Sequence, residues 1–206
     1  MKKTLLSTLI LATLGMASAV ATAQENPWMV RVRATNLNWE NDRSTAALAT
    51  TLDVHAKNLT IPEVDISYFF TKNIVAELVL TYPQRVDVYA GSSNLGSVTA
   101  LPPTLLAQYH FTNFGQLKPY IGAGVNYTRF GSRNLASGNA YSVDKDSWGY
   151  AFQVGTDYMI TKNWGINLDI KYLDIKTNVV DNSTGASAGK LTLSPLATSV
   201  GVTYKF

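Results

Sequence analysis

The 206-residue chain contains no cysteine and only two histidines, His55 and His110. Without cysteine it has no disulfide framework, no thiolate nucleophile and no thiolate metal site. Neither histidine has a second histidine or an acidic cluster at the spacing that metal ligands require, and isolated histidines are more often solvated or structural than catalytic. We therefore expect no catalytic residue, no metal and no cofactor, and we expect that the protein is not an enzyme.

Long apolar runs are absent after the first residues of the chain. The apolar stretch at residues 5–16 follows two lysines and precedes the small residues Ala21-Thr22-Ala23. This layout is that of a secretory signal peptide, and the stretch is too short to span a membrane. We predict a cleaved signal peptide over residues 1–23, with Ala17-Ser18-Ala19 as a competing cleavage site, and one mature domain over residues 24–206.

The mature chain also lacks a clear excess of either charge. Once the two N-terminal lysines are removed, 15 basic residues stand against 14 acidic residues, so the net charge is about +1. No run of basic residues remains, and binding to nucleic acid would need such a basic patch or stripe. We therefore expect no nucleic-acid partner.

What the mature chain does contain is a two-residue alternation of apolar and polar side chains. In the last segment Val200, Val202, Tyr204 and Phe206 share one face, and polar or small residues share the other. No run of eighteen apolar residues competes with this pattern, so spanning helices are excluded. The pattern predicts an all-β fold with eight strands, at residues 28–35, 63–70, 74–82, 105–111, 121–128, 148–160, 164–172 and 199–206.

The connections between these segments differ in length. Thr71-Lys72-Asn73 and Thr161-Lys162-Asn163 form two tight turns with the same sequence, and residues 112–118 form a third short link. Short periplasmic turns and longer extracellular loops are typical of antiparallel outer-membrane barrels. The four longer connections, rich in Gly, Ser and Asn, are predicted as extracellular loops at residues 40–58, 90–98, 130–145 and 178–190.

The orientation of the two strand faces separates a membrane barrel from a soluble one. A soluble barrel turns its apolar face inward around a ligand, and a membrane barrel turns that face to lipid. Aromatic residues gather at the strand ends, as in interface girdles, while the opposite face carries small residues such as Gly122, Gly124 and Gly155 and charges of both signs. We predict an eight-stranded antiparallel transmembrane β-barrel over residues 24–206. A lipocalin-like periplasmic carrier is the alternative, and detergent extraction separates the two.

The charged residues of the inward face are the main candidates for a lumenal cluster. Ionic groups in a confined interior are tolerated when they are paired, so we predict an ion-pair plug. A charge-selective channel is the alternative, but eight strands do not enclose the bore of a porin. The plug residues are predicted to be Arg31, Arg33, Glu63, Asp65, Glu77, Asp157, Asp169, Lys171 and Lys205.

Several motifs resemble a known family. They are LPPTLLAQY at residues 101–109, PYIGAGVNYT at 119–128, DSWG at 146–149 and QVGTDY at 153–158. In this order they resemble the OmpW/AlkL family of outer-membrane proteins. The likeness covers most of the mature chain from Asn73 onward, and the region before residue 58 is similar only loosely.

The resemblance implies a barrel in the bacterial outer membrane that assists the passage of small hydrophobic molecules, through an apolar lumenal pocket with lateral release into lipid. The inward apolar positions predicted to form this hydrophobic pathway are Val79, Leu106, Leu173, Leu52, Leu59 and Ile61. A lateral opening needs a gap in strand pairing, and proline cannot donate to a ladder. The candidate residues for the opening are Pro62, Pro83, Pro102 and Pro103, which could instead only end strands at the rim.

The alternative function is a structural or adhesive barrel, or a receptor for phage or colicins, without transport activity. Polar loops rich in Ser, Asn and Gly suit either function. The expected partners are outer-membrane lipid and lipopolysaccharide, the outer-membrane assembly machinery and small hydrophobic solutes, and we expect a monomer. Gly201, Tyr204 and Phe206 in the last segment are the predicted assembly signal.

Overall fold

The computed structural model describes residues 26–39, 54–90, 93–132, 134–135 and 140–206. Among these residues no helix is long and apolar enough to cross a membrane. Eight long strands form the body of the molecule. They are β1 (Trp28–Trp39), β3 (Leu59–Phe69), β4 (Ile74–Thr81), β7 (Thr104–His110), β8 (Leu117–Gly131), β11 (Asp146–Met159), β12 (Trp164–Leu173) and β15 (Pro195–Lys205).

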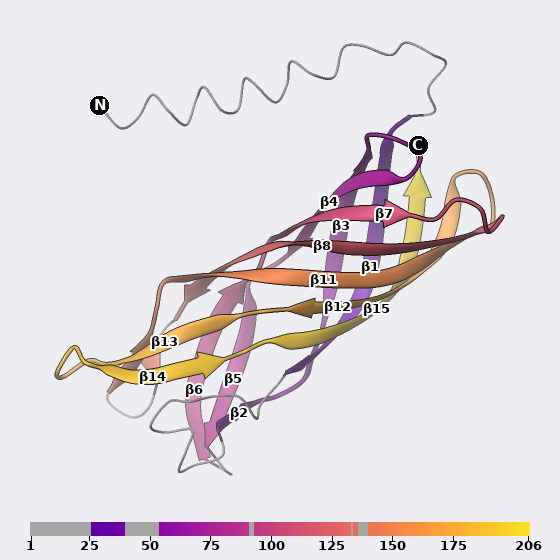
Figure 1. Cartoon of the computed structure of the whole chain (residues 1–206). Coiled ribbons are helices and arrows are strands. Elements are labelled where there is room, and N and C mark those ends of the chain that lie inside the picture. The colour runs from indigo at the N-terminus through magenta and orange to yellow at the C-terminus, as the bar shows by residue number, and fades with distance from the viewer. Residues whose placement is uncertain (1–25, 40–53, 91–92, 133, 136–139) are drawn as a thin grey trace, which may run out of the picture.

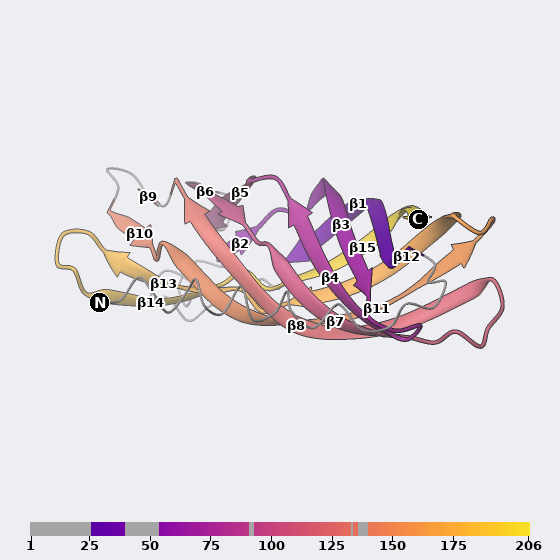
Figure 2. The same cartoon turned by 90° about the horizontal axis from the view of Figure 1, so that it is seen from above.

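These eight strands close into a barrel (Figures 1 and 2). Each is antiparallel to its neighbours in the order β11-β12-β15-β1-β3-β4-β7-β8, and β8 pairs with β11 to complete the ring. The first and last strands pair with each other from Met29↔Lys205 to Trp39↔Pro195. Each of the eight predicted segments forms a strand, so the prediction of an eight-stranded antiparallel barrel is confirmed.

The apolar face of the strands points outward and the polar face points into the lumen. On β1 the side chain of Val32 is 55 % exposed, whereas its neighbour Arg31 is 0 % exposed. On β15 Val202 is exposed and Thr203 is buried. This is the arrangement of a membrane barrel rather than of a soluble carrier, because a soluble barrel would place these apolar side chains inside.

Aromatic side chains form two bands on the outer surface. Trp164 meets the Tyr204 ring edge-to-face at 4.7 Å between centroids, and Tyr204 meets Phe206 at 4.8 Å, near the end of the barrel that carries the short turns. Toward the other end Tyr127 packs on Trp148 at 4.9 Å. Two such bands match the aromatic girdles that lie at the two membrane–water interfaces of an outer-membrane barrel.

Further strands extend the barrel at the end away from the short turns, toward the lower left of Figure 1. β5 (Gln84–Ala90) and β6 (Ser93–Leu101) continue β4 and β7 as a hairpin, and β2 (Val54–Ala56) pairs with β5. A second sheet of four strands comprises β9 (Asn134–Leu135), β10 (Tyr141–Val143), β13 (Lys176–Asp181) and β14 (Ser187–Thr192).

The long loops predicted at residues 90–98 and 178–190 contain paired strands over much of both ranges. Their Gly, Ser and Asn residues obscure the alternation, yet the two hairpins pair their own backbones above the membrane region. In the predicted loop at 130–145 the structure describes parts of β8, β9 and β10. Of the loop predicted at 40–58, residues 40–53 lie outside the described residues.

The outward face of β12 allows a test of the membrane orientation. Leu168 is 56 % exposed and lies midway between Trp164 and Tyr172 on the lipid-facing side. We expect Leu168→Arg to lower the free energy of unfolding by about 2–4 kcal/mol, because the charge is placed near the bilayer midplane. Urea titration of the protein in lipid vesicles, followed by tryptophan fluorescence, measures this change.

The control is Ala186→Arg, which adds the same side chain to the exposed turn between β13 and β14. We expect it to change the free energy of unfolding by less than about 0.5 kcal/mol. Equal effects of the two substitutions would contradict the orientation of the barrel in the membrane.

Candidate functional site

The inward side chains divide the lumen into two layers. We call the first the charged layer, and it lies nearer the short-turn end, where β3–β4, β7–β8 and β11–β12 are joined. Each of its eight charged residues is at most 4 % exposed: Arg31, Arg33, Lys171, Glu63, Asp65, Glu77, Asp157 and Asp169. The second is an apolar chamber on the far side of the charged layer, toward the long hairpins.

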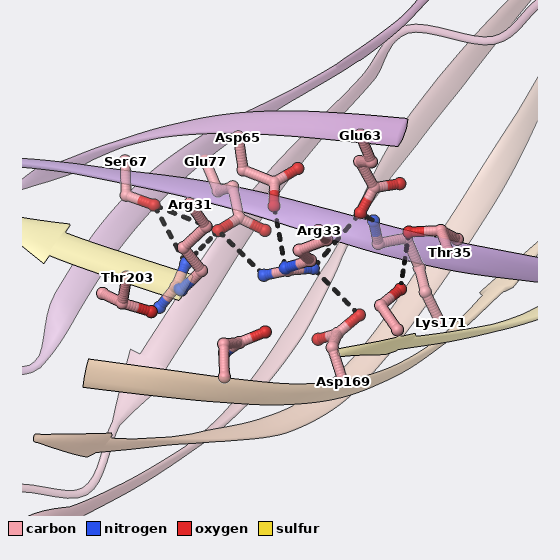
Figure 3. Close-up of polar contacts among 12 residues, drawn as sticks. Arg31, Arg33, Thr35, Glu63, Asp65, Ser67, Glu77, Asp169, Lys171 and Thr203 are labelled. Carbon is pink, nitrogen blue, oxygen red and sulfur yellow. Dashed lines mark hydrogen bonds and ion pairs between the residues drawn. The ribbon is translucent and has the colours of Figure 1, made fainter. Parts of the chain in front are cut away.

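Arg31 lies in the part of the charged layer that is nearer the short-turn end. Its Nε and Nη2 atoms donate to the two carboxylate oxygens of Asp157 at 3.0 and 2.6 Å, which is the bidentate geometry of a strong ion pair. Its Nη1 atom donates to Ser67 at 3.1 Å and also to Glu77 (Figure 3). The hydroxyl of Thr203 also donates to Asp157. Arg31 on β1 thus joins side chains of β3, β4 and β11.

Arg33, two residues along β1, repeats this role farther from the short-turn end and appears to the right of Arg31 in Figure 3. Its guanidinium nitrogens lie 2.9 Å from Asp65, 3.1 Å from Asp169 and 3.3 Å from Glu63. Lys171 completes the layer with an Nζ–Glu63 distance of 3.0 Å. The layer thus holds three cations and five carboxyl groups in a dense network that fills the lumen.

Tyr120 lies in the centre of this network, although the sequence analysis did not single it out. Its ring is 0 % exposed, and its hydroxyl donates to Asp169 at 2.8 Å while it accepts from Asn167 and Arg33. A Cβ at Gly155 would collide with the Tyr120 hydroxyl, so only glycine leaves room for the ring. The available signal was that Tyr120 shares a face with the small residues Gly122 and Gly124, where a large ring has space.

Lys205 lies apart from the rest of the predicted plug. Its Nζ is 5.2 Å from the ring centroid of Phe69, and the residue lines the open cavity at the short-turn end. Lys205 is the last residue of β15, where the strand still pairs with Met29. Its place on the polar face of the strand therefore brings it to the mouth rather than into the charged layer.

The apolar chamber contains most of the predicted pathway residues. Val79, Leu106, Leu173 and Ile61 are buried in one apolar cluster, and Leu59 packs against it. Leu52 lies outside the described residues. The cavity inside the cluster has a volume of only about 20 Å³, and Val79, Leu173 and Ile61 line it. Four further lining residues were missed because they lie beyond the predicted strand ends: Leu37, Trp39, Phe130 and Leu193.

Next to the chamber, the ladder between two strands is interrupted. β3 and β4 pair up to Glu63↔Thr81, and the same register resumes only at Ala56↔Val88, where β2 pairs with β5. Between these points residues 57–62 and 82–87 have no ladder pairing with each other. Pro62 and Pro83 lie where this interruption adjoins the Glu63↔Thr81 pair, and both are exposed.

Pro102 and Pro103 separate β6 from β7, but their backbone is held. Tyr127 N donates to the Pro103 carbonyl at 3.1 Å, and the Asn126 side chain donates to both proline carbonyls. The register of β6 and β7 against β8 is unbroken across the two prolines. Pro102 is buried and lines the chamber. Of the four candidate prolines, Pro62 and Pro83 therefore border the unpaired segment.

The residues of the predicted assembly signal lie in and directly after β15. Tyr204 and Phe206 belong to the lower aromatic band, and Phe206 N donates to the Trp28 carbonyl at 3.1 Å. A Cβ at Gly201 would meet Arg33 Cγ at 2.8 Å, so this glycine makes room for the charged layer. Their recognition by assembly machinery stays a prediction.

No group of three His, Asp or Glu side chains in the described part of the chain could hold a metal ion. The buried carboxylates instead face guanidinium, ammonium, hydroxyl or amide groups. The arrangement of the charged layer is suited to closing the lumen and bracing its walls.

Comparison with known proteins gives consistent matches along most of the chain. A model described as the OmpW family matches residues 24–206. Outer membrane protein W of Vibrio cholerae is 32 % identical over 219 residues and covers 100 % of both chains. The dibenzothiophene metabolism operon protein PahQ of Pseudomonas aeruginosa is 30 % identical over 199 residues, covering 89 % of this chain and 90 % of PahQ.

The fold is similar to that of a protein studied in a bilayer. The solid-state NMR structure of outer membrane protein AlkL in DMPC bilayers matches with a TM-score of 0.67 and 27 % sequence identity. The match covers 91 % of this chain and 94 % of AlkL.

The charged layer predicts a large stability effect for Arg31. We expect Arg31→Met to lower the free energy of unfolding by about 3–5 kcal/mol, because Glu77 and Asp157 stay buried without this cation. Adding Glu77→Gln and Asp157→Asn to this variant should recover part of the loss. Urea unfolding in lipid vesicles measures each variant.

Arg85→Met is the matched control, because Arg85 pairs with Asp87 at 3.6 Å while its side chain is 77 % exposed. An exposed pair contributes about 0–1 kcal/mol, so we expect little change. Similar losses for Arg31→Met and Arg85→Met would show that the charged layer does not brace the barrel.

Proposed function

The chain belongs to the OmpW family, and from that premise we propose that it carries small hydrophobic molecules across the outer surface and releases them sideways into the bilayer. Its relatives and structural neighbour are outer-membrane barrels, and the protein resides in the outer membrane. The short-turn end is then periplasmic and the long hairpins are extracellular.

The observation that carries the proposal is an apolar chamber that stands directly above a charged layer. The chamber offers an apolar solute an environment like lipid, which water and the polysaccharide surface do not. The eight buried charged groups below it are a poor environment for the same solute, because partition there would disturb paired charges. A solute that enters from the extracellular side therefore has no favourable route straight down to the periplasm.

The unpaired segment between β3 and β4–β5 supplies a lateral route from the chamber toward the bilayer. Ile61 and Gln84 line the chamber and belong to residues 57–62 and 82–87, which lack ladder pairing with each other. Pro62 and Pro83 have no backbone N–H to form the missing bonds. We call residues 57–62 and 82–87 together the seam. Separating these two segments breaks no ladder hydrogen bond, so lateral release costs least free energy here.

The chamber must expand when a solute enters. Its cavity of about 20 Å³ has room for about one water molecule. The walls above the charged layer include the β5–β6 hairpin, which contributes Gln84 and Ala100. Displacement of this hairpin widens the chamber and the adjoining seam together, while the charged layer keeps the lower barrel closed.

The name of one relative is consistent with an apolar cargo. PahQ is named for a dibenzothiophene metabolism operon, and dibenzothiophene is an apolar aromatic compound. The second candidate function, a structural or receptor barrel without transport, is favoured by the polar extracellular hairpins and is an outcome of the tests below.

The first test fills the chamber. Ala100 is 4 % exposed and lines the cavity, so Ala100→Trp should block it. We expect cells that carry only this variant to take up labelled naphthalene at the rate of cells that lack the protein. Ala123→Trp adds the same ring on the lipid-facing side and should leave uptake unchanged.

Folding of both variants is checked by heat-modifiable gel mobility. If the wild type gives no more uptake than deletion, the transport function is wrong and the receptor function takes its place. If Ala100→Trp folds and transports normally, the solute does not use the chamber.

The second test closes the seam. The chain has no cysteine, so Pro62→Cys with Tyr82→Cys introduces the only two thiols, at the first position beyond the Glu63↔Thr81 pair. We expect a short bismaleimide crosslink between them to abolish uptake of naphthalene. Ile66→Cys with Leu78→Cys forms the control, because these two residues already pair in the ladder. Full uptake by the crosslinked Pro62/Tyr82 variant would place the exit elsewhere.

A further inference from the structure

A wide cavity opens at the periplasmic end of the barrel, below the charged layer. Its volume is about 910 Å³, which is within the range of small-molecule sites, about 300–1,000 Å³. Asp157 lies at its boundary with the charged layer, and His110 and Met29 also line it. The charged layer separates this cavity from the apolar chamber, so the route proposed for hydrophobic solutes does not use it.

The lining of this cavity, which we call the vestibule, is strongly basic. Lys72, Lys118, Lys162 and Lys205 all line it. Among its lining residues in the described part of the chain the one acidic side chain is Asp157, and both of its oxygens already accept from Arg31. The vestibule therefore has an excess of positive charge.

Two of the lysines are positioned by the repeated turn sequence. In Thr71-Lys72-Asn73 the threonine hydroxyl accepts from the backbone N–H of Asn73 and of Ile74, at 3.2 and 2.9 Å. The Asn73 side chain then donates to the His110 carbonyl at 2.7 Å, which ties the turn to β7.

The turn at Thr161-Lys162-Asn163 has the same bonds. Its threonine hydroxyl accepts at 3.2 and 2.9 Å, and Asn163 donates to the Lys205 carbonyl at 2.6 Å. In each turn the threonine and asparagine hold the backbone while the lysine lines the vestibule. In both turns, therefore, the lysine that carries the positive charge is not one of the residues that hold the backbone.

The vestibule also has an apolar side. Met29, Phe69, Met159 and Ile160 line it together with the lysines. A simple inorganic ion would leave these surfaces in water, whereas a neutral hydrocarbon would bring no negative charge to the lysines. A ligand with an anionic head and a short apolar body matches both kinds of lining.

We propose that the vestibule binds an anionic amphiphile, with its phosphate or carboxylate head between the lysines and its apolar body against Met29, Phe69 and Met159. Lysine ammonium groups bind phosphate as point charges and need no fixed plane. The cavity spans on the order of one Debye length at 0.1 M salt, about 10 Å, so all four lysines contribute and binding weakens as salt rises. The ligand is either a free amphiphile of the periplasm or the headgroup of an anionic phospholipid of the inner leaflet.

The test measures binding of hexyl phosphate to the full barrel in phosphatidylcholine nanodiscs by isothermal titration calorimetry. Hexyl glucoside, which has the same chain and no charge, is the ligand control. We expect Lys72→Gln with Lys162→Gln to weaken binding about tenfold at low salt, since each exposed ion pair contributes up to about 1 kcal/mol. The threonine and asparagine bonds remain in this variant, and heat-modifiable mobility confirms that it folds.

Lys145→Gln with Lys190→Gln removes two exposed lysines from the extracellular end and is the matched control. Unchanged affinity in this control, with loss in the Lys72/Lys162 variant, supports the proposal. Equal affinity of both double variants, equally tight binding of hexyl glucoside, or no binding by the wild type would overturn it.

A further arm distinguishes the two sources of the ligand. In nanodiscs that contain phosphatidylglycerol, weaker apparent binding of hexyl phosphate identifies competing phospholipid headgroups. Unchanged binding identifies a free amphiphile. The Lys72/Lys162 variant should still take up naphthalene at the wild-type rate, so failure of this site and failure of the transport function are separable.

Discussion

The requirement that every backbone N–H and C=O within the hydrocarbon be hydrogen-bonded governs this structure. A sheet meets that requirement only by closing on itself, and the pairing of β1 with β15 closes it here. Closure places one face of every strand in a narrow lumen. Because the apolar face of each strand contacts lipid, the polar face points into the lumen. The charged side chains there must then neutralise one another in a small volume.

The charged layer is the result, and it gives the two ends of the lumen different properties. Arg31 and Arg33, adjacent on the same face of β1, gather carboxylates from strands around the ring. Above them the lumen is apolar and adjoins an unpaired stretch of wall. Below them it is open and basic. One barrel therefore presents two separate environments, because the charged layer lies between them.

The sequence allowed the strands and the facing of their side chains to be predicted, since a period of two appears directly in the order of residues. The charged residues predicted to face the lumen followed from this alternation, because they lie on the face opposite the apolar side chains. Tyr120 was missed because its role depends on the space left by Gly155 on a neighbouring strand, and Trp39 because β1 is longer than its clearest alternation. The hairpins β5–β6 and β13–β14 were taken for loops because composition there resembles loop composition. Where the pairing of β3 with β4 stops depends on contacts between strands, which no local pattern encodes.

The contact between β1 and β15 joins segments from opposite ends of the chain, whereas the β3–β4 and β11–β12 hairpins join neighbours. Local hairpins form early, and contacts between distant segments form late. Until the last strand arrives, β1 and β12 present unpaired edges that can pair with other chains. Both edges are therefore covered in one step, by the pairing of β15 with β1 on one side and with β12 on the other.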